Sequence, residues 1–177
     1  TVLMGQRIAE AGGFVSANIV SSVSGKVKGI EPRLTVSGAK VESIVIENDG
    51  NYTPIEGMGQ YRDYTKMSKE EIIDAVKDAG IVGLGGAGFP THVKLNTKVE
   101  YFIVNAAECE PLIETDKYLC RTFADRIVKT IPVIAESLGA SRKVIALKGA
   151  YEKEIAALRE AIKNSGSDVE IFEMGYF

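Results

Sequence analysis

The residues that could bind a ligand are concentrated in a glycine-rich segment, Gly83-Leu-Gly-Gly-Ala-Gly-Phe-Pro90. Its glycines let the backbone take positive φ angles and approach a ligand closely, and consecutive N–H groups in such a loop can cradle an anion. The segment satisfies the G-x-G-x-x-G dinucleotide pattern, which should leave a strand and enter a helix. Here a predicted helix precedes the loop and Phe89-Pro90 follows it. We therefore expect a phosphate-binding loop of an architecture other than a simple Rossmann NAD site.

A second candidate segment, Asn105-Ala-Ala-Glu-Cys-Glu-Pro111, follows a predicted strand. Ligands in open α/β sheets bind outside the carboxyl ends of the strands. Glu108, Glu110 and Glu114 make this end acidic, and Asn105 can both donate and accept hydrogen bonds. A solvated loop is the alternative reading of this segment alone. Together with the glycine loop, it supplies amides and carboxylates for one crevice.

The residues beside these segments have a functional and a structural reading each. Lys94 could neutralise a phosphate or a developing negative charge on a ring, or it could be a solvated lysine. Phe89 could stack on an aromatic ligand or pack beside Pro90. We expect His92 to be a surface or packing residue, because no partner carboxylate or nucleophile accompanies it. Cys109 lies between two glutamates, which disfavour its thiolate, so we do not interpret it as a nucleophile.

The elements that position the candidates are those of an α/β fold over residues 68–177. A capping box, Ser68 with Glu71, begins a helix that ends near Gly80. Strands alternate with helices after the glycine loop, which predicts a parallel sheet. The predicted strands cover residues 99–104, 143–147 and 169–172, and the predicted helices cover 116–138 and 152–163. We expect Pro132 to kink the first of these helices and Gly139 to end it.

The preceding residues have a different pattern. Residues 1–50 contain short β-branched runs broken by turn residues, which indicates a small barrel or sandwich. Residues 51–67 lack periodicity and are expected to form a linker or a wrapping loop. The sequence thus predicts three segments: a β-rich domain at 1–50, a linker at 51–67 and an α/β domain at 68–177.

Composition narrows the class of protein. The 177 residues have a net charge of −3 and 45% hydrophobic residues, as in ordinary globular proteins. No basic cluster suggests nucleic-acid binding, and no apolar run is long enough to span a bilayer. Two cysteines and one histidine, without metal-ligand spacing, do not predict a metal site. Because the chain begins at Thr1 and stops after a strand-like run, we expect a fragment that is inactive alone.

A carrier module is the competing function. Glu114-Thr-Asp-Lys117 is similar to the sequence around a lipoylated lysine, which must occupy an exposed hairpin tip. Here the tetrapeptide is expected to open a helix, and the β-rich half is expected to have no such tip, although Gly38-Ala-Lys40 comes closest. A lipoyl-like module on a non-catalytic α/β scaffold is therefore kept as the alternative. A dinucleotide-binding domain without flavin is a third reading.

The two central motifs, residues 81–95 and 104–111, closely resemble the C subunit of the Rnf electron-transport complex. The flavin subunit of respiratory NADH:quinone oxidoreductase is a more distant match. Segments 5–10, 13–17 and 23–27 resemble the barrel-sandwich hybrid domain that precedes the flavin domain in Rnf-type proteins. Relatives that share the motifs include a cobalamin reductase and the electron-transfer protein associated with D-proline reductase, toward which the tail 172–177 inclines us slightly.

The resemblance implies a barrel-sandwich hybrid domain followed by a partial Rossmann-like α/β domain that binds FMN non-covalently. It assigns Lys94 and Asn105 to the polar edge of the flavin, Glu108 and Glu110 to the ring and the nicotinamide approach, and Phe89 to stacking on NADH. No side chain is assigned as a general base. The residues that would wrap the phosphate and ribityl side are Gly83, Leu84, Gly85, Gly86, Ala87 and Gly88.

The resemblance also implies what the parent protein does. It would pass electrons from NADH through FMN to another redox carrier, in the cytoplasm, within a complex whose other subunits could associate it with a membrane. A further flavin-contacting segment, a β-grasp domain and, in many members, iron–sulfur motifs would follow this chain. The respiratory subunit has an aspartate where this chain has Ala107, so a ribityl contact made there is not carried over.

Overall fold

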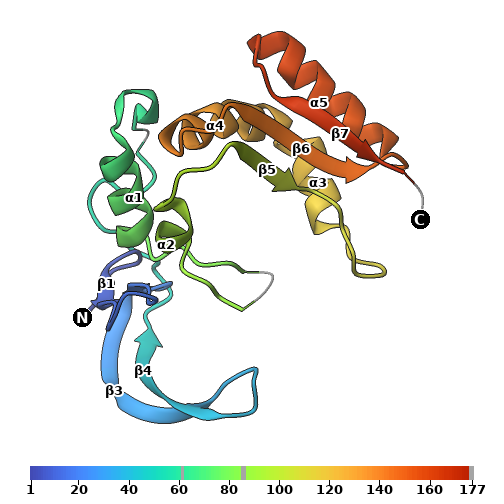
Figure 1. Ribbon diagram of the computed structural model, residues 1–177. Helices are drawn as coiled ribbons and strands as arrows, with labels where there is room; N and C mark the ends of the chain where they lie inside the picture. The colour runs from blue at the N-terminus through green and yellow to red at the C-terminus, as the bar shows by residue number, and fades with distance from the viewer. Residues whose placement is uncertain (61, 85–86, 176–177) are drawn as a thin grey trace. The chain divides into compact units, whose positions relative to one another are not determined.

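The computed structural model describes residues 1–60, 62–84 and 87–175. The chain divides into two compact units (Figure 1). The first unit comprises Thr1–Asp63 and Glu70–Leu95, and the second comprises Tyr64–Lys69 and Asn96–Phe177. Each unit is described by itself.

The first unit contains two antiparallel strand pairs. Strand β1 (Arg7–Ala9) pairs with β2 (Ile19–Val20), and β3 (Gly25–Leu34) pairs with β4 (Lys40–Asn48) in a long hairpin. The register of the hairpin shifts between Val27 and Gly29, which is the signature of a β-bulge. The prediction of strands separated by turns within residues 1–50 is confirmed, although β3 and β4 are longer than the short strands expected.

Polar side chains are buried in the first unit and are satisfied largely by the backbone. Ser24 is 1% exposed, and its hydroxyl donates to Asp49 Oδ1 at 2.7 Å while accepting from the Thr53 N–H at 2.8 Å. The Ser24 hydroxyl, followed by the Asn51 N–H, lowers the pKa of Asp49. One buried hydroxyl therefore ties the start of β3 to the segment that follows β4.

Two helices belong to this unit: α1 (Lys69–Asp78) and α2 (Thr91–Leu95). The Asn18 amide donates to the Lys77 carbonyl at 3.2 Å, which joins the end of α1 to the strands. Gly80 follows α1 with φ +65°, and a Cβ there would lie 2.5 Å from the Asn18 carbonyl oxygen. Residues 70–95 thus pack with the β-rich part, while the domain boundaries expected from the sequence remain a prediction.

The segment between the strands and α1 wraps along the chain's beginning. Met4 donates its N–H to the Thr53 carbonyl at 2.9 Å, and Ile55 donates to the Met4 carbonyl at 3.0 Å. A short 3-10 helix, η1 (Tyr64–Lys66), follows. The expectation of a wrapping loop agrees with these hydrogen bonds.

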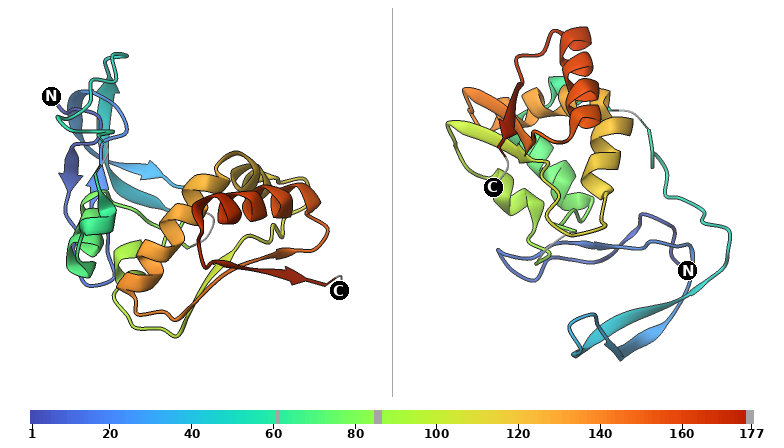
Figure 2. Two further views of the ribbon diagram at one scale, coloured as in Figure 1. Left: turned by 90° about the horizontal axis from the view of Figure 1, so that it is seen from above. Right: turned by 90° about the vertical axis from the view of Figure 1, so that its right-hand side faces the viewer.

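The second unit is built on a three-stranded parallel sheet with the order β5-β6-β7. Its strands are β5 (Tyr101–Asn105), β6 (Arg142–Lys148) and β7 (Glu170–Met174). The helices α3 (Thr115–Thr122), α4 (Ala124–Ser137) and α5 (Glu152–Ser165) lie on one face of this sheet (Figure 2). The predicted α/β alternation and parallel sheet are confirmed.

The helices and the sheet enclose one apolar core. Ile145 and Leu147 point from β6 to the helices, where they meet Val128 of α4 and Leu158 of α5, and all four are fully buried. On the other face of the sheet, the side chains of Ile103 and Phe172 are more than half exposed. Among the described residues, no helix has the length and apolar character that a membrane span requires.

The prediction of one helix over 116–138 is wrong, and the kink expected at Pro132 stays a prediction. The helix is interrupted at Phe123, whose φ of −122° and ψ of 25° are not helical and which caps both α3 and α4. Pro132 lies inside α4, where it removes one N–H donor. The buried neighbours Ile131 and Ala135 hold that helix in the core despite the loss. Gly139, with φ +69°, ends α4 as expected.

The two lysines considered for carrier attachment lie in different settings. Lys117 lies within α3, as expected. Contrary to expectation, the β-rich half does present a hairpin tip: residues 35–39 connect β3 to β4, and Lys40 is the first residue of β4. The reason is that Thr35 closes the turn, with its N–H donating to the Ala39 carbonyl at 2.9 Å.

Candidate functional site

The glycine-rich segment forms a loop closed at its base by two backbone hydrogen bonds. The Gly83 N–H donates to the Phe89 carbonyl at 3.0 Å, and the Thr91 N–H donates to the Ile81 carbonyl at 3.0 Å. Val82 and Pro90 form an antiparallel bridge between these bonds. The base is therefore a short antiparallel ladder, and the described residues Leu84, Ala87 and Gly88 belong to the tip beyond it.

The described part of the tip is open to solvent. Leu84 is 95% exposed, and Gly88 has φ +68°. A Cβ on Gly88 would meet no atom within 4 Å. A phosphate group could therefore approach this backbone without displacing protein atoms. Gly85 and Gly86, which we also predicted as phosphate-binding residues, lie outside the described residues.

The loop leads directly into α2, the helix that carries Lys94. The buried residues Leu95 and His92 anchor this helix, and the Lys94 side chain is exposed. The expectation that His92 is a packing residue is confirmed, although its buried Nδ1 has no hydrogen-bond partner in the described chain. Phe89 is partly exposed beside the ladder, where its ring is available for contact with a flat ligand.

The acidic segment begins at the carboxyl end of β5 in the second unit. Ala106 donates its N–H to the Ala146 carbonyl at 2.8 Å, which extends the pairing with β6 by one residue. Asn105 is exposed, and its Oδ1 accepts from the Ala107 N–H at 3.1 Å. This bond fixes the side-chain oxygen of Asn105 and leaves its NH₂ group as the donor that can face a ligand.

The loop after Asn105 is fixed from two sides. Glu108 Oε2 accepts from the Asp116 N–H at 3.4 Å, at the start of α3. The Glu108 carbonyl accepts from the Tyr151 hydroxyl at 3.2 Å, just before α5. Glu110 continues the exposed loop. Two helix starts therefore position the backbone that presents these carboxylates.

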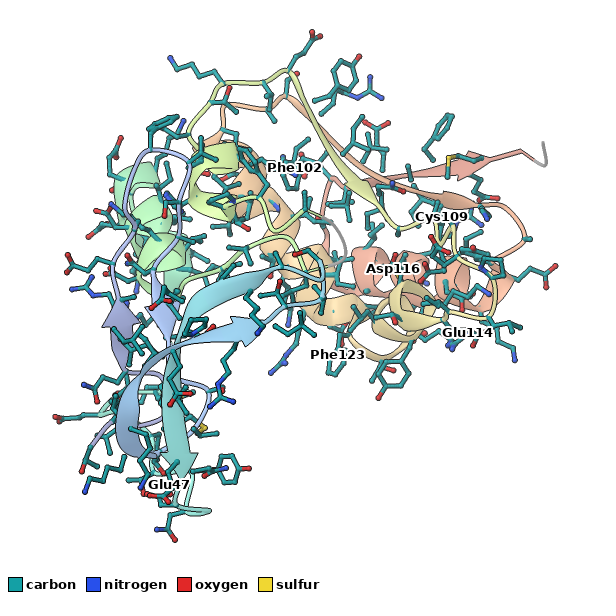
Figure 3. All side chains as sticks on the ribbon, turned by 90° about the horizontal axis from the view of Figure 1, so that it is seen from below. Glu47, Phe102, Cys109, Glu114, Asp116 and Phe123 are labelled. Atoms are coloured by element: carbon teal, nitrogen blue, oxygen red, sulfur yellow. The ribbon has the colours of Figure 1, made fainter. Side chains whose placement is uncertain are left out.

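A cavity of about 500 Å³ lies at this loop. Figure 3 labels Cys109 and Glu114, two of its lining residues. Its lining combines carboxylates, two lysines, a tyrosine ring and apolar side chains: Glu108, Cys109, Glu110, Pro111, Leu112, Ile113, Glu114, Lys117, Lys148 and Tyr151. A pocket of this size and mixed lining matches those that take small organic ligands.

The charges around the cavity are partly neutralised within the protein. Lys117 lies 3.3 Å from Glu114 and Arg121 lies 3.5 Å from it. The hydrogen bond from Lys117 and its charge, followed by Arg121, lower the pKa of Glu114. Glu114 is therefore held ionised and paired, so part of the acidity expected at this end of the sheet is neutralised by Lys117 and Arg121.

Sequence reasoning missed Lys148 and Tyr151, which line the cavity from the loop after β6. Part of the signal was present, since Lys148 directly follows the predicted strand 143–147, which is expected in the same parallel sheet as the strand before Asn105. Carboxyl ends of parallel strands meet at one edge, so both residues belong to the edge at which ligands bind. The end of the strand predicted at 143–147 is therefore a second place where the sequence lets ligand-binding residues be expected.

The candidate residues fall into both units. Gly83, Leu84, Ala87, Gly88, Phe89 and Lys94 belong to the first unit, and Asn105, Glu108 and Glu110 belong to the second. The structure groups the residues within each half, and their assembly into one flavin site stays a prediction. Within the described residues, no group of three or more metal-ligating side chains is found. Burial raises the pKa of the Cys120 thiol.

Comparison with known proteins gives family matches for both parts of the chain. The Nuo51 FMN-binding domain matches residues 76–176, and the RnfC barrel sandwich hybrid domain matches residues 1–51. The C subunit of the Na(+)-translocating ferredoxin:NAD(+) oxidoreductase complex of Acetobacterium woodii is 40% identical over 178 residues, which covers 98% of this chain and 40% of the relative. Cobalamin reductase PduS of Salmonella typhimurium is 49% identical over 92 residues, covering 52% and 20%.

Solved structures agree with this assignment. The NAD+-reducing [NiFe]-hydrogenase in the H2-reduced state matches with a TM-score of 0.55 and 25% identity. The matched region covers 62% of this chain and 22% of the hydrogenase chain. The air-oxidised state has a TM-score of 0.50 and 28% identity, with 60% and 20% covered. The chain spans less than half the length of the relatives it matches. It belongs to the Nuo51 FMN-binding domain family, whose model matches residues 76–176, and its residues 1–51 match the RnfC barrel sandwich hybrid domain.

Proposed function

We propose that the complete protein passes electrons from NADH through a non-covalent FMN to another redox carrier. The observation that carries the proposal is the open glycine tip on its two-bond ladder, within a stretch that matches an FMN-binding domain. The relatives named above include a ferredoxin:NAD(+) oxidoreductase component and a cobalamin reductase, which are redox proteins. Their chemistry is the class that the proposal assigns to this chain.

The described residues fit an FMN on two counts. The tip residues Leu84, Ala87 and Gly88 are exposed, and no side chain obstructs the backbone at Gly88, as a phosphate cradle requires. Asn105 keeps an NH₂ donor at the carboxyl end of β5, where a ligand's polar edge would lie. We assign Gly83–Gly88 to the phosphate and ribityl side of the flavin.

The remaining candidates receive complementary roles. Lys94 would donate a charge-assisted hydrogen bond to the polar edge of the flavin, together with Asn105. Glu108 and Glu110 would line the approach of the nicotinamide, and Phe89 would stack on the dinucleotide. When bound, FMN supplies the hydride and electron chemistry, which is a property of the cofactor. The protein residues bind and orient the two partners, and none is required to act as a base.

The setting of the protein is proposed on the same basis. Its partners would be other subunits of an electron-transfer complex, and NADH would be its donor. We place it in the cytoplasm, associated with a membrane through those subunits and without an inserted segment of its own. Iron–sulfur clusters would belong to parts of the protein outside this chain. The relation to the proline-reductase-associated protein depends on the tail 172–177 and remains a prediction.

The carrier alternative is not favoured. Lys117 lies in a helix, where it could not serve as an exposed hairpin-tip attachment site. Lys40 does lie beside a hairpin tip, but the family matches are to redox proteins. An intact-mass measurement of the natural protein tests this directly, because a lipoyl or biotinyl group on a lysine would add its mass.

The experiment that tests the proposal is a visible spectrum of the complete protein, purified in the folded state and titrated with FMN. We expect the absorption bands of bound flavin, which NADH bleaches under anaerobic conditions. A folded protein that is colourless and takes up no added FMN would contradict the proposal. Flavin binding without reduction by NADH would retain the cofactor and reject the donor.

The role of Lys94 is tested by Lys94→Ala in the same protein. Loss of a charge-assisted contact should weaken FMN binding by about 1–3 kcal/mol. Lys77→Ala is the matched control, because Lys77 is also an exposed lysine at a helix of the first unit. Equal FMN dissociation constants for Lys94→Ala and wild type, measured by fluorescence quenching, would remove Lys94 from the site.

A further inference from the structure

We propose that the cavity at the carboxyl end of the sheet binds the diphosphate of the dinucleotide donor, with Lys148 as its anion-binding residue. The inference rests on the proposed function, since it identifies a subsite for the NADH of that reaction. Its anion-binding residue, Lys148, is one that the sequence did not single out. Its basis is the distribution of charge around one cavity of the second unit.

Lys148 lies at a strand end and lines the cavity. It is the last residue of β6, and its ammonium group lies 6.0 Å from the centre of the Tyr151 ring. The following residue, Gly149, donates its N–H to the Met174 carbonyl at 2.9 Å. This bond continues the sheet beyond Lys148 and fixes its backbone at the edge. Lys148 therefore presents a positive charge to the cavity from a rigid strand end.

The positive charge of Lys148 is available to a ligand. The other lysine that lines this cavity, Lys117, is already paired with Glu114, and Arg121, one turn further along α3, pairs with Glu114 and Glu154. Across the described chain, no carboxylate forms an ion pair with Lys148. An anion that enters the cavity would meet the Lys148 ammonium group without displacing an internal partner.

The rest of the cavity lining includes carboxylates. Glu108 and Glu110 face the same cavity, and they would repel a bare anion. A nucleotide carries both kinds of group, since its ribose hydroxyls can donate to carboxylates and its phosphates can accept from an ammonium group. The volume of about 500 Å³ lies within the range for small-molecule sites. A phosphate attached to a ribose is therefore the anion that fits this lining.

The test uses the complete FMN-loaded protein and isothermal titration with ADP-ribose, which contains the diphosphate and lacks the nicotinamide. Lys148→Gln should weaken ADP-ribose binding about tenfold, as expected for a lost charge-assisted bond. Lys148→Arg should retain most of it. Adenosine, which has no phosphate, should bind wild type and Lys148→Gln equally. Lys163→Gln, an exposed lysine in the last turn of α5, is the matched control.

Kinetics give a second readout. The KM for NADH should rise with Lys148→Gln, while kcat and the FMN content stay unchanged. Pyrophosphate should compete with NADH in the wild type and lose this effect in Lys148→Gln. Unchanged ADP-ribose affinity, an equal loss for adenosine, or pyrophosphate binding without competition would overturn the assignment. If NADH reduces the wild-type flavin and Lys148→Gln behaves as wild type, the subsite alone fails. A wild type that NADH does not reduce overturns the proposed function as well.

Discussion

The two units of this chain bury different kinds of side chain. The second unit encloses an apolar core of helix and sheet residues, among which Val128, Ile145, Leu147 and Leu158 are fully buried. Buried residues of the first unit include Asn18 and Ser24, whose side chains bond to the backbone of other segments, and Ser21, whose hydroxyl donates to the nearby Val23 carbonyl. In the second unit stability follows from excluding water, and in the first it also depends on hydrogen bonds between segments.

The difference bears on how each unit presents ligand-binding groups. In the second unit, Asn105 and Lys148 end strands of one sheet, so a packed core fixes their backbone positions. In the first unit, the glycine tip is held by a ladder of two hydrogen bonds. The strand ends offer groups whose backbone positions are set before a ligand arrives, whereas two backbone hydrogen bonds hold the base of the glycine loop.

The largest effect should come from opening the apolar core. Leu158→Ala removes a side chain that is 0% exposed and leaves a cavity, so the free energy of unfolding of the second unit should fall by about 3 kcal/mol. Native-state hydrogen exchange of the β6 amides measures it. Leu119→Ala, a truncation at an exposed position of α3, is the control and should cost under about 1 kcal/mol. Equal effects of the two truncations would show that the second unit does not depend on its apolar core.

A smaller effect should follow from removing the partner of a buried charge. Glu154 of α5 is 4% exposed and accepts a hydrogen bond from Arg121 of α3 at 2.5 Å. Arg121→Met leaves this carboxylate without its cation, which should destabilise the second unit by about 2 kcal/mol, because the partly exposed arginine site admits some water. Urea unfolding measures the change.

The controls for this pair separate charge from packing. Lys129→Met removes an exposed cation from α4 and should change stability little. Replacing both partners, as in Arg121→Met with Glu154→Met, should restore much of the loss, because no unpaired charge remains. A double variant as unstable as Arg121→Met alone would mean that shape, and not charge, determines the effect.

The same contrast between the two units explains which parts of the fold the sequence predicts. Residues 99–172 were predicted well, because β-branched strands and an amphipathic helix carry periodic signals that match their burial. The interruption at Phe123 was missed, because the signal used was Pro132. The proline is tolerated where Ile131 and Ala135 anchor the helix, whereas Phe123 leaves the helical conformation with its ring beside Tyr118 and Arg126. Such tertiary preferences are not encoded in local propensity.

The candidate site follows from the sequence only in part. Glycines and carboxylates at a loop and a strand end are visible as motifs, so the sequence proposes Gly83–Gly88, Asn105, Glu108 and Glu110, whose binding roles stay predictions. Lys148 and Tyr151 carry no motif, and they enter the cavity because the sheet order places the end of β6 beside β5. Long-range pairing creates this neighbourhood, and a single sequence shows it only after the topology is known.

The smallest of these effects is expected in the first unit. Ser24→Ala removes the acceptor of the Thr53 N–H and the donor to Asp49, and the lost backbone bond alone should cost about 1 kcal/mol. Because the Ser24 hydroxyl lowers the pKa of Asp49, the ionised carboxylate stabilises the folded state above its unfolded pKa of about 3.9. This contribution is lost as the pH falls through the lower folded pKa.

The Ser24→Ala variant should therefore differ from wild type more at pH 7 than at a pH below the folded pKa of Asp49. Urea unfolding followed by NMR signals of β3 and β4 amides measures this at both pH values. Ser37→Ala, at the exposed tip of the hairpin, is the control and should unfold as wild type does. A difference that does not depend on pH would assign the effect to the Thr53 bond alone. An unchanged stability at both pH values would mean that buried hydrogen bonds do not hold the first unit together, and that its contrast with the second unit is one of composition only.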